Sequence, residues 1–238
     1  LDAVIAEVER QGAEAIPVFG YPAGLAFEAL LIDAEGHARA DVALAFVFRF
    51  AGPEAAASLQ NINIPVISLV SLYGRSEAEW RASAEGLSMF EGTFQVAVPE
   101  LSGLVAPTVV GSQERLEDPA TGLAIVVRQP IASRVTMAVR RALGYAALAA
   151  ASNADKRVAI LFYNYPPGKA GIGASYLNVA EALSNLLTRL EREGYDLGGD
   201  EIDLSADALL HEITTKARNV GGYAPGELDA MLAQDSVV

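Results

Sequence analysis

Two apolar runs without polar alternation constrain the fold more than any other feature of this sequence. Residues 42–48 (Val-Ala-Leu-Ala-Phe-Val-Phe) and 64–70 (Ile-Pro-Val-Ile-Ser-Leu-Val) are apolar at nearly every position, and a predicted helix over 54–59 lies between them. A strand that is apolar on both sides is typical of a parallel sheet covered by helices on both faces. The sequence therefore predicts an α/β fold with open, mainly parallel sheets flanked by helices.

Hydrophobic periodicity and turn residues predict the other elements. The predicted helices cover residues 1–8, 131–152 and 176–190. The predicted strands cover residues 15–19, 96–98, 105–110, 123–127 and 157–163, and the third and fourth of these pair as a hairpin with a long loop. Two lobes follow: an α/β lobe over residues 1–155, and the truncated start of a second α/β lobe over 156–238.

Two local signals concern the first lobe. Ser76-Glu-Ala-Glu79 is a capping-box pattern, which predicts the start of a short helix. Trp80 follows on that helix, and we interpret it as a packing anchor rather than a ligand platform because of its large area and its charged neighbours.

Charge and composition exclude several classes of function. The chain has 17 Lys and Arg against 30 Asp and Glu, a net charge of -13, which argues against a nucleic acid or an anionic membrane as the main partner. It has no cysteine, which excludes disulfides, thiolate zinc sites and cysteine nucleophiles. No apolar run approaches the roughly 18 residues of a membrane helix, so we expect no membrane span and a cytoplasmic location. Because the first residue is Leu1, we expect a segment of a longer chain.

A glycine-rich loop over residues 164–175 lies between a predicted strand and a predicted helix, where free amides and the helix dipole suit an anion. A phosphate-loop motif is excluded by its spacing, because no glycine stands five positions before Gly168 and Ala170 replaces the Ser or Thr. The dinucleotide motif is excluded because Tyr176 replaces its last glycine. Two interpretations stay open: a tight turn, or binding of a ligand's acidic group through Lys169 and the turn amides.

Glu100 is the one carboxylate that stands out. It follows the predicted strand over 96–98, and ligands of α/β sheets bind at the carboxyl ends of strands. The alternatives are a turn cap or a partner for an arginine. The two histidines, His37 and His211, do not form the His-x-x-x-His pair of a helical metal site.

These motifs together resemble the large subunit of the cobaltochelatase and magnesium-chelatase family. Their order and spacing match that family from about Leu1 to Tyr195. The matching blocks are Trp80 with Gly86-Leu87, Gln95-Val-Ala-Val-Pro-Glu-Leu-Ser-Gly103, Pro107-Thr-Val-Val110, Asn164-Tyr-Pro-Pro-Gly-Lys169, Gly171-Ile-Gly173 and Tyr176-Leu-Asn-Val179. Ser102 is a departure, since the family commonly has Asp there.

The resemblance implies a metal-chelatase subunit, a ligase that forms nitrogen–metal bonds. Such a subunit binds a tetrapyrrole, either a porphyrin or a corrin precursor, and inserts Mg²⁺ or Co²⁺ as the metal substrate. ATP and its Mg²⁺ are expected on ATPase partner subunits, with no cofactor bound by this segment itself, which agrees with the missing phosphate loop. Family members are several times longer and carry a His- and Gly-rich block downstream. We therefore expect this segment to need the rest of the large subunit and to be inactive alone.

The candidate site residues follow from the motifs and the resemblance. Metal insertion needs a base that accepts the pyrrole protons, and Glu100 is the catalytic candidate. The ligand-binding candidates are Lys169, Tyr165, Gly171 and Gly173, and the Tyr165 ring can contact a planar macrocycle.

Three alternatives stay open at this point. The first is a tetrapyrrole-handling relative that removes metal, such as a haem dechelatase, because the shared blocks do not separate insertion from removal. The second is a two-lobed small-ligand-binding module without chemistry, similar to periplasmic binding proteins. The third is a scaffold that docks the ATPase partners through its acidic ends.

Overall fold

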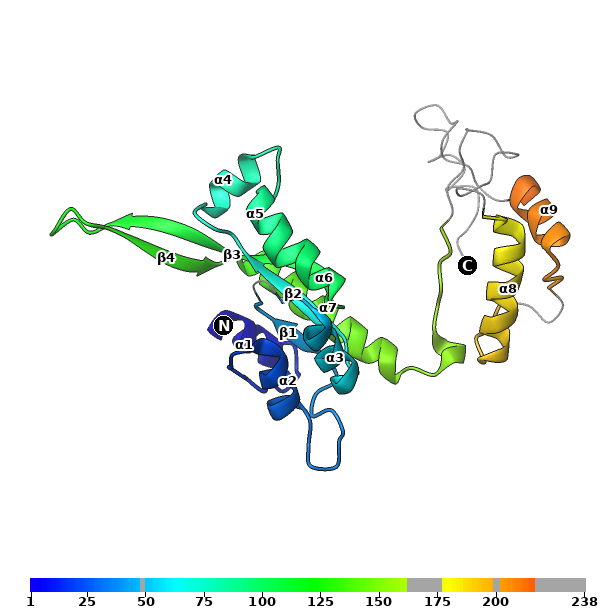
Figure 1. Cartoon of the computed structure of the whole chain (residues 1–238). Helices are drawn as coiled ribbons and strands as arrows, with labels where there is room; N and C mark the ends of the chain where they lie inside the picture. The colour runs from blue at the N-terminus through cyan, green and yellow to red at the C-terminus, as the bar shows by residue number, and fades with distance from the viewer. Residues whose placement is uncertain (48–49, 162–176, 199–201, 217–238) are drawn as a thin grey trace. The chain divides into compact units, whose positions relative to one another are not determined.

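The computed structural model describes residues 1–47, 50–161, 177–198 and 202–216. The chain divides into two compact units, unit 1 over Leu1–Ala150 and unit 2 over Ala151–Val238 (Figure 1). Among the described residues, no helix has both the length and the apolar character needed to cross a membrane.

Unit 1 is built on one four-stranded sheet in the order β1-β2-β3-β4. The strands are β1 (Ala43–Ala45), β2 (Val66–Ser71), β3 (Val105–Glu117) and β4 (Ala124–Pro130). β1, β2 and β3 run parallel, and β4 pairs with β3 antiparallel. This mainly parallel sheet with flanking helices confirms the predicted α/β class. Figure 1 shows that β3 and β4 continue as a two-stranded ribbon beyond the helices.

The ribbon is longer than the predicted hairpin. Polar residues expected in its loop are part of β3, because the ladder continues to the pair Glu117 and Ala124. The sequence therefore predicted the hairpin but not the position of its turn.

Helices cover both faces of the sheet. Those of unit 1 are α1 (Asp2–Arg10), α2 (Ala23–Leu31), α3 (Pro53–Ile62), α4 (Glu77–Ala82), α5 (Met89–Glu91), the π-helical η1 (Gly92–Ala97), α6 (Val98–Leu101) and α7 (Ala132–Ala150).

Alternate residues of β2 point to opposite faces. Val66 packs into the core with α2 and α3, whereas Ile67 and Leu69 pack against α1 and α7. The uninterrupted apolar run of β2 thus has the two-sided burial that its pattern predicted.

Two predicted strands of unit 1 are wrong or shorter than expected. Residues 15–19 are irregular, and Phe19 is 95% exposed. Pro17 cannot donate a ladder hydrogen bond, which disfavours a strand there. Of the predicted strand over 42–48, only Ala43–Ala45 pairs with β2 among its described residues.

The predicted strand before Glu100 is also wrong. α5, η1 and α6 follow one another without a break from Met89 to Leu101, so Glu100 lies in the last helical turn and its side chain is exposed. The helix begins at a capping box in which the Ser88 hydroxyl accepts from the Glu91 amide and the Glu91 carboxylate accepts from the Ser88 amide. An apolar run such as 96–98 does not separate strand from helix by itself, and the Ser-x-x-Glu pattern eight residues earlier decides for the helix.

The Ser76 capping box and the interpretation of Trp80 as a packing anchor agree with the structure. Ser76 and Glu79 make both reciprocal bonds at the start of α4. Trp80 packs beside a buried cluster that includes Val70 and Ile131, and the Arg134 guanidinium lies 5.6 Å from its ring centroid. Trp80 therefore anchors α4 to the sheet.

A buried carboxylate holds the end of β2 to the helix that begins at Ser88. The Glu91 side chain is fully buried and accepts hydrogen bonds from the Tyr73 amide (2.7 Å), the Ser88 amide (2.8 Å) and the Ser88 hydroxyl (2.7 Å). The carboxylate also forms an ion pair with Nη2 of Arg75. The Nη1 group of the same guanidinium donates to the Gly86 carbonyl at 3.0 Å. Burial by itself raises the pKa of the Glu91 carboxyl group, but these hydrogen bonds and the Arg75 charge outweigh it and hold the pKa below its usual range.

This lowered pKa predicts a pH-dependent contribution to stability. The stabilisation from ionised Glu91 is complete above the unfolded-state pKa of about 4.3, and it is lost as the pH falls through the lower folded-state value. We expect Glu91→Gln to lower the free energy of unfolding by about 1–3 kcal/mol near neutral pH, and we expect this difference to shrink below about pH 4. Urea unfolding of both proteins between about pH 7 and 3 measures it. A difference that stays constant with pH would show that the charge of Glu91 contributes nothing.

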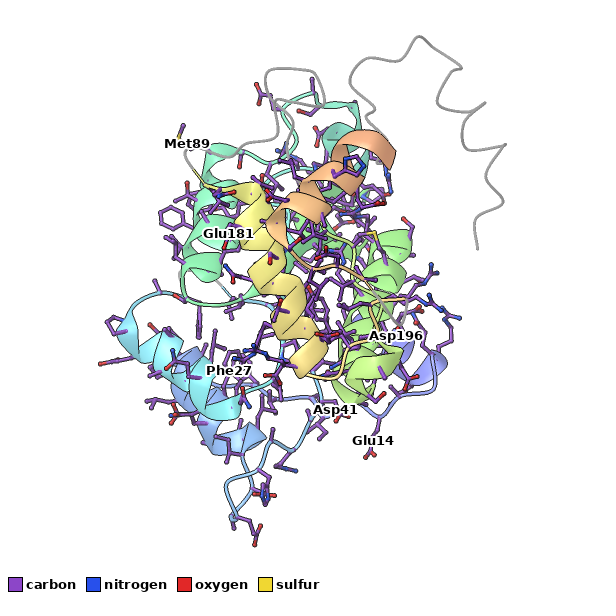
Figure 2. The ribbon with its side chains drawn as sticks, turned by 90° about the vertical axis from the view of Figure 1, so that its right-hand side faces the viewer. Glu14, Phe27, Asp41, Met89, Glu181 and Asp196 are labelled. Carbon is purple, nitrogen blue, oxygen red and sulfur yellow. The ribbon has the colours of Figure 1, made fainter. Side chains whose placement is uncertain are left out.

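Unit 2 contains η2 (Asn153–Asp155), α8 (Val179–Arg192) and α9 (Ala206–Lys216). α8 and α9 pack side by side (Figure 2). The described part of the predicted helix over 176–190 is confirmed, and Gly194, with φ of 82°, follows its end in the left-handed region. The predicted buried strand over 157–163 is wrong for its described residues, 157–161, which form no strand and are mostly exposed. Among the described residues, no neighbouring strand supplies the ladder hydrogen bonds that a strand requires.

Candidate functional site

The candidate site is a cavity of about 450 Å³ within unit 2. Three stretches of chain form it: the irregular segment after α7, the C-terminal half of α8, and the loop that leads toward α9. The lining residues are Ala154, Asp155, Lys156, Arg157, Val158, Ile160, Leu187, Leu190, Tyr195, Asp196, Leu197, Gly198, Ile202 and Leu204. A volume of this size lies within the range of small-molecule sites, roughly 300–1,000 Å³.

Each stretch presents its side chains for a local reason. The irregular segment lies along the cavity, so its consecutive residues 154–158 line it, and so does Ile160. Leu187 and Leu190 are three apart on α8 and therefore lie on one face of that helix. The segment is tied to the end of α8 by the Asn153 side chain, which donates to the Glu193 carbonyl at 2.7 Å. The cavity thus has apolar walls on two sides.

Lys156 contributes a positive charge to a lining that is partly polar and partly apolar. Its Nζ donates to the Asn153 side-chain oxygen at 2.9 Å and lies 5.9 Å from the centroid of the Tyr195 ring. Both side chains are half-buried. An ammonium group over an aromatic ring keeps donors for a further acceptor, since it has three N–H groups. Lys156 can therefore meet an anionic group of a ligand whose body lies against Tyr195.

The acidic residues of the lining are held by local hydrogen bonds. Asp155 accepts from the Ser152 hydroxyl at 2.6 Å, and Asp196 accepts from the Gly198 amide at 2.8 Å. Lys156 and Arg157 form no ion pair within the part of the chain that the structure describes. The lining thus combines apolar side chains with the cations Lys156 and Arg157, either of which can bind an anionic group of a ligand.

The predicted ligand-binding residues are not among the described residues that line this cavity. Lys169, Tyr165, Gly171 and Gly173 lie outside the described residues. In the sequence they fall between Ile160, which lines the cavity, and α8. Their role stays a prediction.

Glu100 belongs to unit 1 and does not line the cavity. It is an exposed helical residue rather than a strand-end carboxylate, and its role as the base also stays a prediction. Within the described ranges, no group of three or more His, Asp or Glu side chains is arranged to hold a metal ion.

Sequence reasoning missed Lys156, Arg157 and Tyr195. The signal available was the Lys-Arg pair directly before an apolar run, which places two cations at one end of an apolar segment. Tyr195 could not be paired with Lys156 from the sequence, because the two residues are brought together only by the packing of the segment against α8.

A comparison with family models identifies the relatives of this chain. The family model described as CobN/Magnesium Chelatase matches residues 1–234. The chain belongs to this family. The resemblance on which the sequence analysis relied is therefore confirmed.

Curated members of the CobN/magnesium chelatase family align with most of the chain. The chloroplastic magnesium-chelatase protein ChlH of Oryza sativa subsp. indica is 32% identical over 225 residues, which cover 89% of this chain and 15% of that protein. A magnesium-chelatase subunit of Cereibacter sphaeroides is 29% identical over 257 residues, covering 100% of this chain and 21% of its own length. The aerobic cobaltochelatase subunit CobN of Sinorhizobium sp. is 29% identical over 231 residues, covering 94% and 18%.

A solved structure shares the fold. The catalytic subunit of cobaltochelatase from Mycobacterium tuberculosis superimposes with a TM-score of 0.66 at 24% identity, over 89% of this chain and 18% of that chain. The chain thus spans about a fifth or less of the length of these relatives. The family is a family of metal chelatases with Mg²⁺ or Co²⁺ as the metal substrate, as the names of its members state.

Proposed function

We propose that this chain is a segment of a chelatase large subunit that binds a tetrapyrrole, a porphyrin or a corrin precursor, for ATP-dependent insertion of Mg²⁺ or Co²⁺. The observation that carries the proposal is the family match over residues 1–234. The proposed partners are the rest of the large subunit and ATPase subunits that bind ATP and Mg²⁺. The missing phosphate-loop motif supports the assignment of ATP to those subunits.

The unit 2 cavity is the proposed contact with the macrocycle. A tetrapyrrole is planar and largely apolar and carries carboxylates at its edge. Leu187, Leu190 and Tyr195 supply apolar and aromatic surface, and Lys156 supplies a charge-assisted donor for a carboxylate. The predicted residues Lys169, Tyr165, Gly171 and Gly173 are proposed to add further contacts.

The proposed chemistry requires a base as well as a binding site. Insertion of a divalent metal displaces two protons from the pyrrole nitrogens; a carboxylate in reach of the macrocycle accepts one of them, and water accepts the other. Glu100 of unit 1 is the proposed base, because its carboxylate is exposed and it belongs to the Pro-Glu-Leu-x-Gly block that the sequence shares with the family. This proposal is separate from that of the unit 2 cavity and does not depend on it. The rest of the large subunit is needed for the reaction, so the segment alone is expected to bind without inserting metal.

A titration of the 238-residue chain with protoporphyrin IX and with a corrin tests the binding step. We expect saturable binding, followed by absorbance in the Soret region for the porphyrin. Lys156→Ala is expected to weaken binding by about ten- to a hundredfold, because a hydrogen bond to a charged group contributes about 1.5–3 kcal/mol. The matched control is Arg192→Ala, which removes an exposed positive charge of α8 outside the cavity lining and is expected to leave affinity unchanged.

Two outcomes would contradict this proposal at different levels. Equal affinities of the Lys156→Ala variant and the parent chain would overturn the cavity as the site. Absence of binding by a chain shown to be folded by circular dichroism would overturn macrocycle binding by this segment.

A further inference from the structure

The helix over residues 89–101, formed by α5, η1 and α6, buries the polar side chains Glu91 and Gln95 toward the sheet and exposes the apolar side chains Met89 and Leu101 at its two ends. Residues four apart along it share a face, because the wider π-helical turn of η1 reduces the angular drift that an α-helix would have at this spacing. A helix on the surface of a globular protein normally buries apolar side chains and exposes polar ones. The exposed apolar side chains of Met89 and Leu101 therefore call for an explanation outside the packing of unit 1 itself.

The inward face consists of Glu91, Gln95 and Pro99, all of them buried. The Gln95 side-chain oxygen accepts from the Ser71 amide at 3.0 Å, and its nitrogen donates to the Ser71 carbonyl at 2.9 Å. Together with the bonds of Glu91 to Tyr73 and Arg75, these contacts add to the packing of Val96 against the buried cluster that includes Val70 and Ile131. The orientation of the helix is thus fixed by polar bonds as well as by apolar packing.

The outward face consists of Met89, Thr93, Ala97 and Leu101, which we call the outer stripe; three of these four residues are apolar and exposed. Met89 is 89% exposed and Leu101 is 88% exposed. Figure 2 shows the Met89 side chain directed away from the helix at the edge of the unit. Beside the outer stripe lies Tyr73, which is 66% exposed. Its ring contacts Phe90 with centroids 5.5 Å apart, so aromatic surface continues the stripe at the end of β2.

We propose that the outer stripe is a docking face that another part of the chelatase large subunit covers with an apolar, uncharged surface. Exposed apolar surface of this kind on a fixed helix marks a protein interface. The relatives supply the occupant: the matched segment is 15% of one relative and 21% of another, so most of such a protein lies outside it. This inference rests on the family match and is independent of tetrapyrrole binding.

The charges around the stripe fit a protein surface better than a lipid surface. The helix over 89–101 contains no Lys or Arg, and its charged residues are the inward Glu91 and the exposed Glu100. Helices that lie on membranes carry Lys and Arg on their polar face, and the net charge of the chain is -13. An uncharged apolar protein face meets the stripe without burying an unpaired charge.

Cysteine labelling tests the proposal, since the segment has no cysteine of its own. Leu101→Cys and Met89→Cys would each be made in the 238-residue chain and in the full-length large subunit that contains it. The rate of maleimide modification at that peptide would be followed by mass spectrometry. The control is Ala34→Cys, in an exposed polar loop away from the helix. Circular dichroism would check that each variant folds.

We expect both stripe cysteines to react at least about tenfold more slowly in the full-length protein than in the segment, because a covered side chain reacts only when the interface opens. The control should react at similar rates in both. Equal rates at the stripe would overturn the proposal. Protection in the segment that rises with its own concentration would identify a second copy as the occupant instead, and protection only with added lipid vesicles would identify a membrane. Either result would replace the proposal.

Discussion

Replacing Arg75 with alanine is expected to lower the free energy of unfolding of unit 1 by about 3 kcal/mol. Glu91 is fully buried, and removal of its partner leaves a carboxylate charge in the interior, a change that typically costs about 3–5 kcal/mol. The lower end applies here, because the Arg75 side chain is 22% exposed and Glu91 keeps its hydrogen bonds to Tyr73 and Ser88. Urea unfolding followed by the fluorescence of Trp80, the single tryptophan of the chain, measures unit 1 alone.

The matched control for this prediction is Arg81→Ala. Arg81 pairs with Glu77 at 2.8 Å, but the two side chains are 51% and 39% exposed, so water screens the pair. We expect a loss below about 1 kcal/mol, which includes the contact of Arg81 with the Trp80 ring. Similar losses for the two variants would show that Glu91 does not need Arg75.

Replacing Ile67 with alanine is expected to cost about 2–5 kcal/mol, because it opens a cavity in the centre of the sheet. Ile67 has no exposed surface, and it packs in one cluster with Val139 of α7. β2 lies between β1 and β3, so the surrounding elements cannot close around a smaller side chain without disturbing both pairings. The same urea experiment measures the loss.

Ile125→Ala is the control for this substitution. Ile125 lies on β4 and is 53% exposed, so the same change of side chain removes little buried surface. We expect a change within about 0.5 kcal/mol. If the Ile67 variant were equally stable, the two-sided burial of β2 would be wrong.

Sequence patterns predicted the elements whose environment they record directly. The apolar run of β2 reflects burial on both faces, and the helical period over residues 131–152 reflects one packed face of α7. The capping box at Ser76 is complete within four residues, so it needs no distant partner to form. In each case the deciding interactions are local or repeat along the element.

The wrong predictions depend on partners that lie far along the chain. Residues 157–161 have the composition of a strand, but a strand needs a neighbour, and the described residues offer none. The helix over 89–101 buries the polar residues Glu91 and Gln95 beside Pro99, so its hydrophobic pattern misled the interpretation of residues 96–98. The pairing of Glu91 with Arg75 joins residues 16 apart in sequence, and no local motif announces it.

The sequence predicted the family but not the cavity of unit 2. The family blocks pointed to a tetrapyrrole site, and they are a property of the sequence alone. The cavity is formed by three stretches that meet through the packing of unit 2, and no single stretch has a distinctive motif. Lys169, Tyr165, Gly171 and Gly173 therefore remain predictions from the sequence, beside Lys156 and Tyr195 from the structure.

The two edge strands of the sheet differ in how well they prevent a strand of another molecule from pairing with them. β1 is only three residues long and offers a neighbouring strand little to pair with. β4 ends in Arg128-Gln-Pro130, where a charge and a residue without an N–H interrupt any further ladder. The other half of β4, Ala124–Val127, has neither safeguard, and its free backbone groups lie on a ribbon that extends beyond the helices (Figure 1). Unwanted association of this chain by strand addition would therefore begin at the tip of the ribbon. A lysine introduced into this part of β4 is the substitution that would prevent such association.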